Sequence, residues 1–409
     1  MTYLYSKISS DGYLGSGGLT TFSIYAGLSA DELSLHSSVG SLQLLAFYRN
    51  DLSVNTGGYE FWSIIYSHLF VCNSMIEGLN NNTSISAIVQ KQLLSEAKFM
   101  RALLYWYLIN IYGDVPLIHG TDYKINSGLS RSPKSEVIAS IIKDLEEAEQ
   151  FLSKDYLDRT LLKVSSERIR PNKYAASAML ARAYLYNKEY SKAISKSTEI
   201  ITQDSFYGLT ELENVFLKNS KEAIWQLQPV NSNWNTEDAR IFILPSTGPN
   251  NSSNPVFLSP YLVNAFEIGD RRKEIWTSVY SDITGDYFYP TKYKNATNGL
   301  AVTEYLMVLR LAEQYLIRAE ARVMQGNIED GISDVNLLRA RARDNIPGSL
   351  PNLPNSLNKE EALMAIIQER KIELFTEWGH RWLDLKRYDI IDNIMSSVTS
   401  QKRWYLGYD

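Results

Sequence analysis

Hydrophobic side chains recur every three or four residues along several long stretches of the chain. Between residues 85 and 112 such side chains collect on one helical face: Met100, Leu103, Leu104, Tyr107, Leu108 and Ile111. Gly113 and Pro116 follow this stretch, as is typical just beyond the C-terminal end of a helix. The same period predicts helices over 61–79, 135–152 and 359–378, so the pattern indicates a mainly α fold.

Two further stretches each predict a pair of antiparallel helices. One pair begins at Pro171 and turns at Asn187-Lys188, and the other begins near Ala312 and turns at Gly326-Asn327. In both pairs the first helix has small side chains on one face and the second returns with an apolar face. This plan resembles the tetratricopeptide repeat of about 34 residues, in which stacked helix pairs share a core. We therefore expect tetratricopeptide-like helical pairs.

The stretch between these pairs, residues 204–303, lacks helical periodicity. It is rich in Asn, and Pro245, Gly248 and Pro249 add residues that favour turns. Short apolar runs such as 223–227 have the composition of strands. We expect one domain over 1–409, with a helical scaffold at about 61–203 and 304–390 and a loop-rich, ligand-binding half at about 204–303.

Composition narrows the class of protein. The 409 residues are 44% hydrophobic and 21% charged, which is typical of a globular chain, and the net charge of −5 gives no reason to expect binding to nucleic acid or to an anionic membrane. No run of about 18 apolar residues occurs, and Met1–Leu4 does not begin a secretory signal. The single cysteine, Cys72, lies in an apolar stretch and is expected to be buried and inert.

Residues that carry chemistry do not form a catalytic pattern. The four His have no metal-ligand spacing, and the chain has no phosphate-binding Gly-rich loop and no nucleophile elbow. We therefore expect no cofactor, no metal and no enzymatic activity. Glu369, Glu373 and Glu377 form a stripe on one helix face, which suits ion pairs better than the paired carboxylates of a glycosidase. The expected partners are the basic residues nearby in sequence: Arg370, Lys371, Arg381, Lys386 and Arg387.

Two charged residues, Glu96 and Arg101, lie within the apolar helix at 85–112. A charge in such a position most often pairs with an opposite charge on another helix. We predict that Arg101 is at least half-buried and paired with a carboxylate.

The segment 96–117 resembles the hallmark of the SusD/RagB family, a Glu-Ala-x-Phe-x-Arg-Ala helix followed by Tyr-Gly-Asp-Val-Pro-Leu. Further resemblances occur in the same order along the chain as in the family: 30–33, 62–66, 265–272, 309–321, 336–342, 369–374 and 379–387. The family begins with a lipoprotein signal and a lipidated cysteine, and it tends to extend beyond the point where this chain stops. We therefore expect that the sequence is without the family's natural ends.

The resemblance implies a function as well as a fold. Members of the family are surface lipoproteins of the outer membrane, held by a lipid anchor, that pass glycans, and in some members peptides, to a SusC-like TonB-dependent transporter. It implies a non-catalytic protein that binds a polysaccharide or oligosaccharide, and it implies that most of the matched signature residues form the scaffold.

Sugar binding requires aromatic faces together with planar polar side chains on loops, and the chain has 27 Tyr and 8 Trp. The run from Asn231 to Asn235 offers Trp234 flanked by the amides of Asn231 and Asn233, with Asp238 and Arg240 just after it. The alternative interpretation is a turn whose Trp folds back onto the core.

A second candidate patch contains Tyr48 and Tyr59, and the alternative interpretation of these residues is an ordinary polar connection before the helix at 61–79.

The predicted function also has an alternative, because helical repeats often bind peptides or proteins. Exposed aromatic side chains on loops would favour a small ligand, whereas exposed aromatics on the concave helical face would favour a partner chain.

Overall fold

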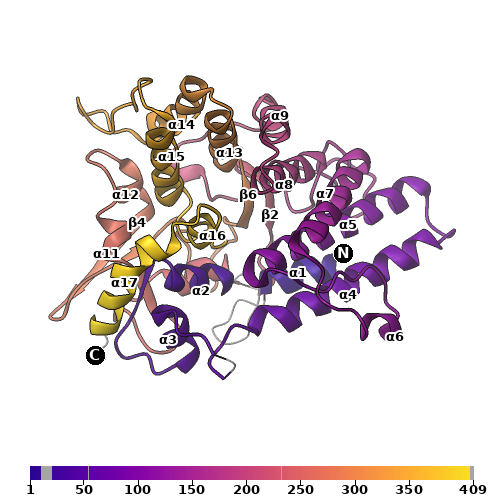
Figure 1. Cartoon of the computed structure of the whole chain (residues 1–409), viewed down its shortest axis with the longest axis horizontal. Helices are drawn as coiled ribbons and strands as arrows, with labels where there is room; N and C mark the ends of the chain where they lie inside the picture. The colour runs from indigo at the N-terminus through magenta and orange to yellow at the C-terminus, as the bar shows by residue number, and fades with distance from the viewer. Residues whose placement is uncertain (11–20, 54, 232, 406–409) are drawn as a thin grey trace.

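A computed structural model of the protein describes residues 1–10, 21–53, 55–231 and 233–405. The scaffold consists of the helices α4 (Glu60–Asn80), α5 (Ala87–Tyr112), α7 (Lys134–Phe151), α8 (Lys173–Tyr186), α9 (Tyr190–Ile201), α13 (Leu311–Met324), α14 (Ile328–Ala342) and α15 (Lys359–Glu373). Each packs on the next in this order, and Figure 1 shows them as an arc from α4 and α5 to α14 and α15. The predicted mainly α fold with tetratricopeptide-like pairs is confirmed.

Local sequence explains where several of these helices begin. The side chain of Asn172 accepts a hydrogen bond from the backbone N–H of Ala175, and Asn358 forms a reciprocal capping box with Glu361 at the start of α15. Helix α8 is buried on all sides between 174 and 185. Its many alanines allow α7 and α9 to approach it closely from two sides.

Outside the scaffold and the loop-rich half, the described residues form six further helices that were not predicted from the sequence. They are α1 (Thr2–Ser10), α2 (Phe22–Ser29), α3 (Leu42–Arg49), α6 (Tyr123–Asn126), α16 (His380–Arg387) and α17 (Ile391–Tyr405). Every residue of α2 is buried, so it has no polar face for a periodic pattern to reveal. The helix predicted at 359–378 ends at Glu373, because Thr376, Trp378 and Gly379 adopt left-handed backbone conformations before α16 begins.

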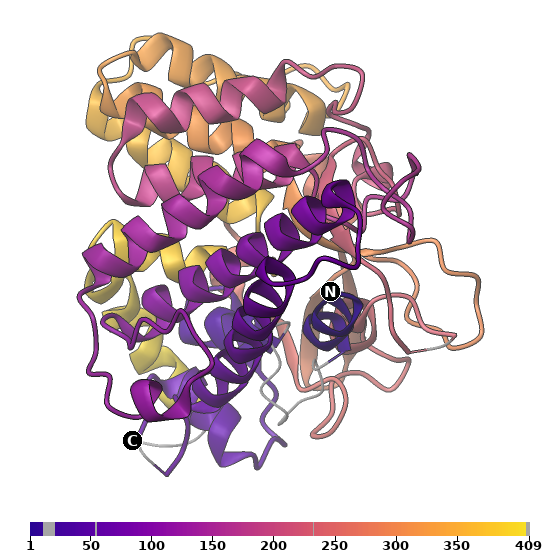
Figure 2. The same cartoon turned by 90° about the vertical axis from the view of Figure 1, so that its right-hand side faces the viewer.

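The half without helical periodicity contains short elements joined by loops. They are η2 (Leu212–Asn214), β2 (Ala223–Leu227), α10 (Glu237–Phe242), β3 (Val256–Leu258), α11 (Pro260–Val263), α12 (Arg271–Trp276), β4 (Thr277–Asp282) and β5 (Gly285–Pro290). Strand β3 pairs antiparallel with β1 (Leu33–Leu35), β2 with β6 (Leu306–Arg310), and β4 with β5. Figure 2 shows these segments gathered on the right, with the helical pairs on the left and at the top.

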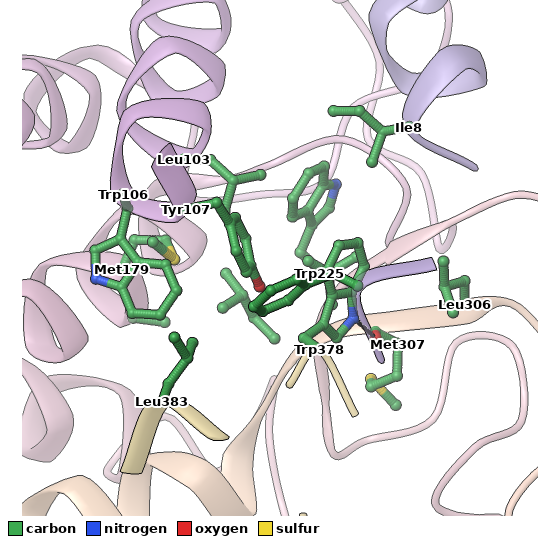
Figure 3. Packing of buried hydrophobic residues seen from close by; sticks show 14 of the residues in the cluster. Ile8, Leu103, Trp106, Tyr107, Met179, Trp225, Leu306, Met307, Trp378 and Leu383 are labelled. Carbon is green, nitrogen blue, oxygen red and sulfur yellow. Dashed lines mark hydrogen bonds between the residues drawn. The ribbon is translucent and has the colours of Figure 1, made fainter. Parts of the chain in front are cut away.

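The main core lies where the helical scaffold meets this loop-rich half. The Trp225 ring of β2 lies edge-on to Phe99 of α5, with the ring centroids 5.1 Å apart. Trp378 donates a hydrogen bond from Nε1 to the Met307 carbonyl oxygen of β6 at 2.7 Å, close to Tyr107 of α5 in Figure 3. Strand β2 is completely buried, so the loop that follows it starts from a fixed base.

Candidate ligand-binding site

A pocket of about 510 Å³ opens in the loop-rich half, a volume typical of small-molecule sites. Its wall combines the loop after β2 with α10, the segment after α10, and residues near 253 and 297. The lining includes Trp234, Arg240, Leu244, Pro245, Asn254 and Thr297. The pocket therefore contains two of the residues selected from the sequence, Trp234 and Arg240.

Helix α10 is held in place at both ends by side chains. At its N-terminal end the hydroxyl of Thr236 accepts a hydrogen bond from the backbone N–H of Ala239 at 3.0 Å. At the other end the Asn254 amide donates to the carbonyl oxygens of Arg240 and Ile241, at 3.0 and 2.8 Å, and to that of residue 243. Six residues are too few for a stable isolated helix, so these bonds position the pocket wall.

One carboxylate connects two of the predicted residues, Arg240 and Asn231, and a third, Trp234, lies beside Arg240. The guanidinium carbon of Arg240 lies 5.7 Å from the centroid of the partly exposed Trp234 ring. Glu237 forms an ion pair with Arg240 and accepts a hydrogen bond from the Asn231 amide at 2.5 Å. Glu237 was not selected from the sequence, although its spacing of three residues from Arg240 on a helix is a signal for an ion pair.

The backbone of the Trp234 loop is fixed by its neighbours. Asn233 is exposed, has a left-handed backbone with φ of 71°, and its carbonyl oxygen accepts a hydrogen bond from the N–H of Gly299 at 2.8 Å. Asn235 is buried, and its side-chain oxygen accepts from the backbone N–H groups of Thr303 and Glu304 at 2.8 and 3.0 Å. Asn235 therefore holds the loop in place, whereas Asn231 and Asn233 remain on the surface beside Trp234.

Asp238 is buried in α10 and does not line the pocket, so its selection as a ligand contact is corrected. Burial, together with the nearby carboxylates of Glu237 and Glu377, raises the pKa of this carboxyl to about 8, against the lowering effect of Lys292. A single polar residue on a short helix gives no sequence signal of which way it points, and in the structure this one points inward.

The second patch selected from the sequence does not form. Tyr48 belongs to α3 and is 2% exposed, with the Lys402 ammonium 4.8 Å from its ring centroid. Tyr59, just before α4, is 62% exposed. The two tyrosines therefore offer no common surface, because Tyr48 lies on the buried side of α3, out of reach of solvent.

The Glu stripe of α15 forms ion pairs, as predicted, but with partners distant in sequence. Glu373 contacts the guanidinium groups of Arg272, Arg310 and Arg341, the Arg310 contact being 2.6 Å. Glu369 pairs with Arg272 and Arg339, and Glu377 pairs with Arg310 and Lys292. The basic residues expected from the sequence pair elsewhere: Arg370 and Arg387 with Asp384, and Lys371 and Arg381 with Asp31.

The structural roles predicted for Arg101 and Cys72 are confirmed. Arg101 is 6% exposed and forms a bidentate ion pair with Asp144 of α7. Glu96, also buried, binds Arg170 at 2.7 Å and accepts a hydrogen bond from the Tyr5 hydroxyl. Cys72 is completely buried, and burial raises the pKa of its thiol to about 12.

Two other kinds of feature are absent from the part of the chain that the structure describes. Among residues 1–10, 21–53, 55–231 and 233–405, no group of three or more His, Cys, Asp or Glu side chains is arranged to hold a metal ion. Within the same ranges, each helix is too short or too polar to cross a bilayer.

Stacked helix pairs beside a loop-rich half define a helical-repeat architecture. One family model, described as starch-binding and associating with the outer membrane, matches residues 23–185, and the SusD family model matches residues 276–406. The chain belongs to the SusD/RagB family.

Individual relatives agree with this assignment. SusD-like protein P2 of Formosa agariphila is 25% identical over 80% of this chain and 71% of its own length. A SusD-like protein of Bacteroides ovatus is 25% identical over 89% of this chain and 71% of its own.

Solved structures share the fold. A laminarin-binding SusD-like protein superposes with a TM-score of 0.77 at 22% identity, covering 97% of this chain and 92% of its own. Surface glycan-binding protein A from Bacteroides fluxus superposes with a TM-score of 0.76 at 20% identity, covering 96% and 88%.

Proposed function

We propose that this chain is a non-catalytic protein of the cell surface that binds a glycan in the Trp234 pocket and delivers it to a SusC-like TonB-dependent transporter in the outer membrane. The observation that carries the proposal is the arrangement of Trp234 and Arg240 on one pocket wall, with the exposed amides of Asn231 and Asn233 beside them. Family membership and the outer-membrane description of one matching family model support the location.

The chemistry of the pocket suits a sugar. A pyranose ring has apolar C–H faces that can lie against an indole ring, and its hydroxyl groups each need donors and acceptors. Trp234 offers the apolar face, and Arg240 and Thr297 offer polar groups around it. Because the loop is fixed through Asn235 and α10 through Asn254, little conformational entropy is lost when a ligand binds.

The carboxylates near the pocket argue for binding without hydrolysis. A glycosidase needs two carboxyl groups about 5–9 Å apart on either side of the scissile bond. Glu237 is engaged by Arg240 and Asn231, and Asp238 is buried behind the pocket wall. Glu369, Glu373 and Glu377 are buried and held by arginines and a lysine.

A second candidate function is binding of a protein or peptide by the helical scaffold. The observation that favours it is a set of exposed aromatic side chains on that side: Phe70 of α4 is 52% exposed and Tyr123 of α6 is 73% exposed. Aromatic side chains of this kind are enriched in protein interfaces. This surface is compatible with a transporter partner, so it can complement the glycan site.

The test is a binding screen of the purified protein against starch, laminarin, pectin and a set of peptides, followed by Trp234→Ala. We expect Trp234→Ala to weaken binding of the glycan at least about tenfold, equivalent to about 1.4 kcal/mol, with the melting temperature nearly unchanged. Tyr59→Ala removes an exposed aromatic outside the pocket and serves as the matched control.

Three results would contradict the proposal. Retained binding together with a large fall in melting temperature would make Trp234 a structural residue. Loss of binding in Tyr59→Ala alone would move the site to that position. Turnover of any polysaccharide, abolished by one Asp or Glu substitution, would make the protein an enzyme.

A further inference from the structure

A second pocket, of about 420 Å³, lies at the other end of the loop that carries Trp234. Its walls come from α1, from the connection between α7 and α8, and from the residues just after β2. Residues 227–230 line this second pocket and Trp234 lines the first, so the two linings come within four residues of each other along the chain.

The second pocket has a preformed frame. The connection between α7 and α8 folds back on itself, with the Asp158 N–H donating to the Lys163 carbonyl oxygen at 2.9 Å. The Arg168 guanidinium donates to the carbonyl oxygens of Ala223 and Phe206 at 2.6 and 2.7 Å, which ties this connection to β2. The Ser9 hydroxyl of α1 donates to the Gln228 carbonyl oxygen at 2.6 Å. Each wall is thus bonded to another.

The lining of the second pocket combines apolar surface with planar polar side chains, as binding of a sugar chain requires. Leu157, Ile169 and Pro229 provide apolar surface, and Arg159 and Gln228 provide exposed planar polar groups beside it. A purely apolar groove would suit a helix or a lipid, whereas alternating apolar and planar polar groups suit C–H faces and hydroxyls.

The two pockets are close enough for one ligand to reach both. Val230 lines the second pocket and Trp234 lines the first. Four residues of fully extended chain span at most about 14 Å, so the backbones of these two lining residues lie no further apart than that. Asn231 and Asn233 are exposed on the stretch between them. Figure 2 shows α1, near the label N, beside the segments of the loop-rich half.

We propose that the second pocket is a further subsite for the same glycan, so that the protein recognises an extended oligosaccharide that reaches from the pocket at Trp234 to the pocket at Gln228. The proposal rests on the glycan-binding function proposed above. A ligand that fills both pockets gains from the high effective concentration of its second half, because binding of the first half already places it there.

The charges of the two pockets point to a neutral glycan. In the first pocket the charge of Arg240 is paired with Glu237. In the second, the lining includes Arg159 together with two carboxylates, those of Asp158 and Glu167, which offset its charge. The other lining guanidinium, of residue 170, is bound to a buried glutamate. Neither lining therefore carries an excess of positive charge that would favour a uronic acid or a sulfated sugar.

The experiment compares short and long ligands of one linkage. Dissociation constants are measured for maltose and long malto-oligosaccharides, for laminaribiose and long laminari-oligosaccharides, and for oligogalacturonides. Ser6→Trp places a large ring at the second pocket, and Tyr3→Trp places the same ring on α1 outside that lining as the control. Arg159→Ala is a second variant at an exposed position, in case Ser6→Trp disturbs α1.

We expect the wild-type protein to bind long chains of one neutral series about 100-fold more tightly than the disaccharide, at the lower end of the gain from linked sites. Ser6→Trp should remove most of that gain and leave the disaccharide affinity unchanged, Arg159→Ala should reduce the gain, and Tyr3→Trp should resemble wild type.

Other outcomes separate the two proposals. Unchanged long-chain affinity in both Ser6→Trp and Arg159→Ala, with binding lost in Trp234→Ala, would overturn the second subsite and leave the glycan function intact. Preferential binding of oligogalacturonides would overturn the assignment to a neutral glycan. Failure of every series to bind would overturn the glycan function and the subsite together.

Discussion

The ion pair between Arg101 and Asp144 gives the sharpest test of how the helical scaffold is held together. Arg101 of α5 donates from Nε and from one terminal nitrogen to the two carboxylate oxygens of Asp144 on α7, at 2.7 and 2.8 Å. Its other terminal nitrogen donates to the Asn73 side-chain oxygen of α4 at 2.9 Å. One side chain thus joins three neighbouring helices, and both charged side chains are 8% exposed.

Arg101→Ala removes these bonds and leaves a buried carboxylate without its partner. Breaking a buried pair from one side costs about 3–5 kcal/mol. Unfolding of a chain of 409 residues has an entropy near its midpoint of about 0.9 kcal/mol/K, from about 2.1 cal/mol/K per residue. A loss of about 4 kcal/mol therefore lowers the melting temperature by about 5 °C. Circular dichroism during thermal and urea unfolding measures both quantities.

The same two helices supply a matched control. Lys98 of α5 pairs with Glu147 of α7, but these side chains are 25% and 35% exposed. Exposed pairs contribute about 0–1 kcal/mol, so Lys98→Ala should lower the melting temperature by about 1 °C or less. A result for Arg101→Ala indistinguishable from that of Lys98→Ala would refute the reasoning.

A double variant identifies the source of the loss. Arg101→Met combined with Asp144→Leu removes both charges and keeps apolar volume between the helices. Replacement of a buried ion pair in this way is often neutral or stabilising, so we expect the double variant to recover most of the stability lost in Arg101→Ala. If it does not, the loss comes from packing or from Asn73 rather than from the unpaired carboxylate.

Three other groups give predictions that depend on burial and backbone geometry. Asp238 has a folded-state pKa of about 8, above its ordinary value, so the folded protein keeps a proton that the unfolded chain loses. The stability of the protein should therefore fall as pH rises from about 4 to 8. In urea titrations, Asp238→Asn should flatten this pH dependence and stabilise the protein at pH 8, and an unchanged slope would contradict the prediction. Cys72 should react with a thiol reagent at pH 8 only on unfolding, since burial raises the pKa of its thiol to about 12; rapid labelling of the native protein would disprove this. Gly269 and Gly348 both have positive φ, but an added Cβ at Gly269 would lie 2.3 Å from the Cβ of Ser349, whereas the space at Gly348 is open. Gly348→Ala should therefore cost only about 1–2 kcal/mol of backbone strain, and Gly269→Ala should cost clearly more in urea unfolding; equal losses would rule out the contact with Ser349 as the cause.

The candidate site could be predicted only in part from the sequence. Trp234 and Arg240 were selected because an aromatic ring and planar polar groups occur together in a stretch rich in turn-forming residues, and both line the pocket. Asp238 and Tyr48 were selected on the same local grounds, and both are buried. A short segment such as α10 or α3 has no long periodic pattern from which the direction of one side chain can be inferred. Only the packing around it decides which side faces solvent.

The sequence by itself determined the helical scaffold, because long helices with one apolar face leave a repeating pattern over many turns, as between 87 and 112. It also determined that Arg101 and the Glu stripe would be paired, since buried charges are stable only with partners. The tertiary structure decided which residues are those partners. Glu373 forms ion pairs with Arg272, Arg310 and Arg341, which come from three different elements. It likewise decided that residues near 234, 254 and 297 close around one pocket. Contacts between segments so far apart depend on how the elements pack in space, and that packing is set by the sum of many weak interactions that no local pattern contains.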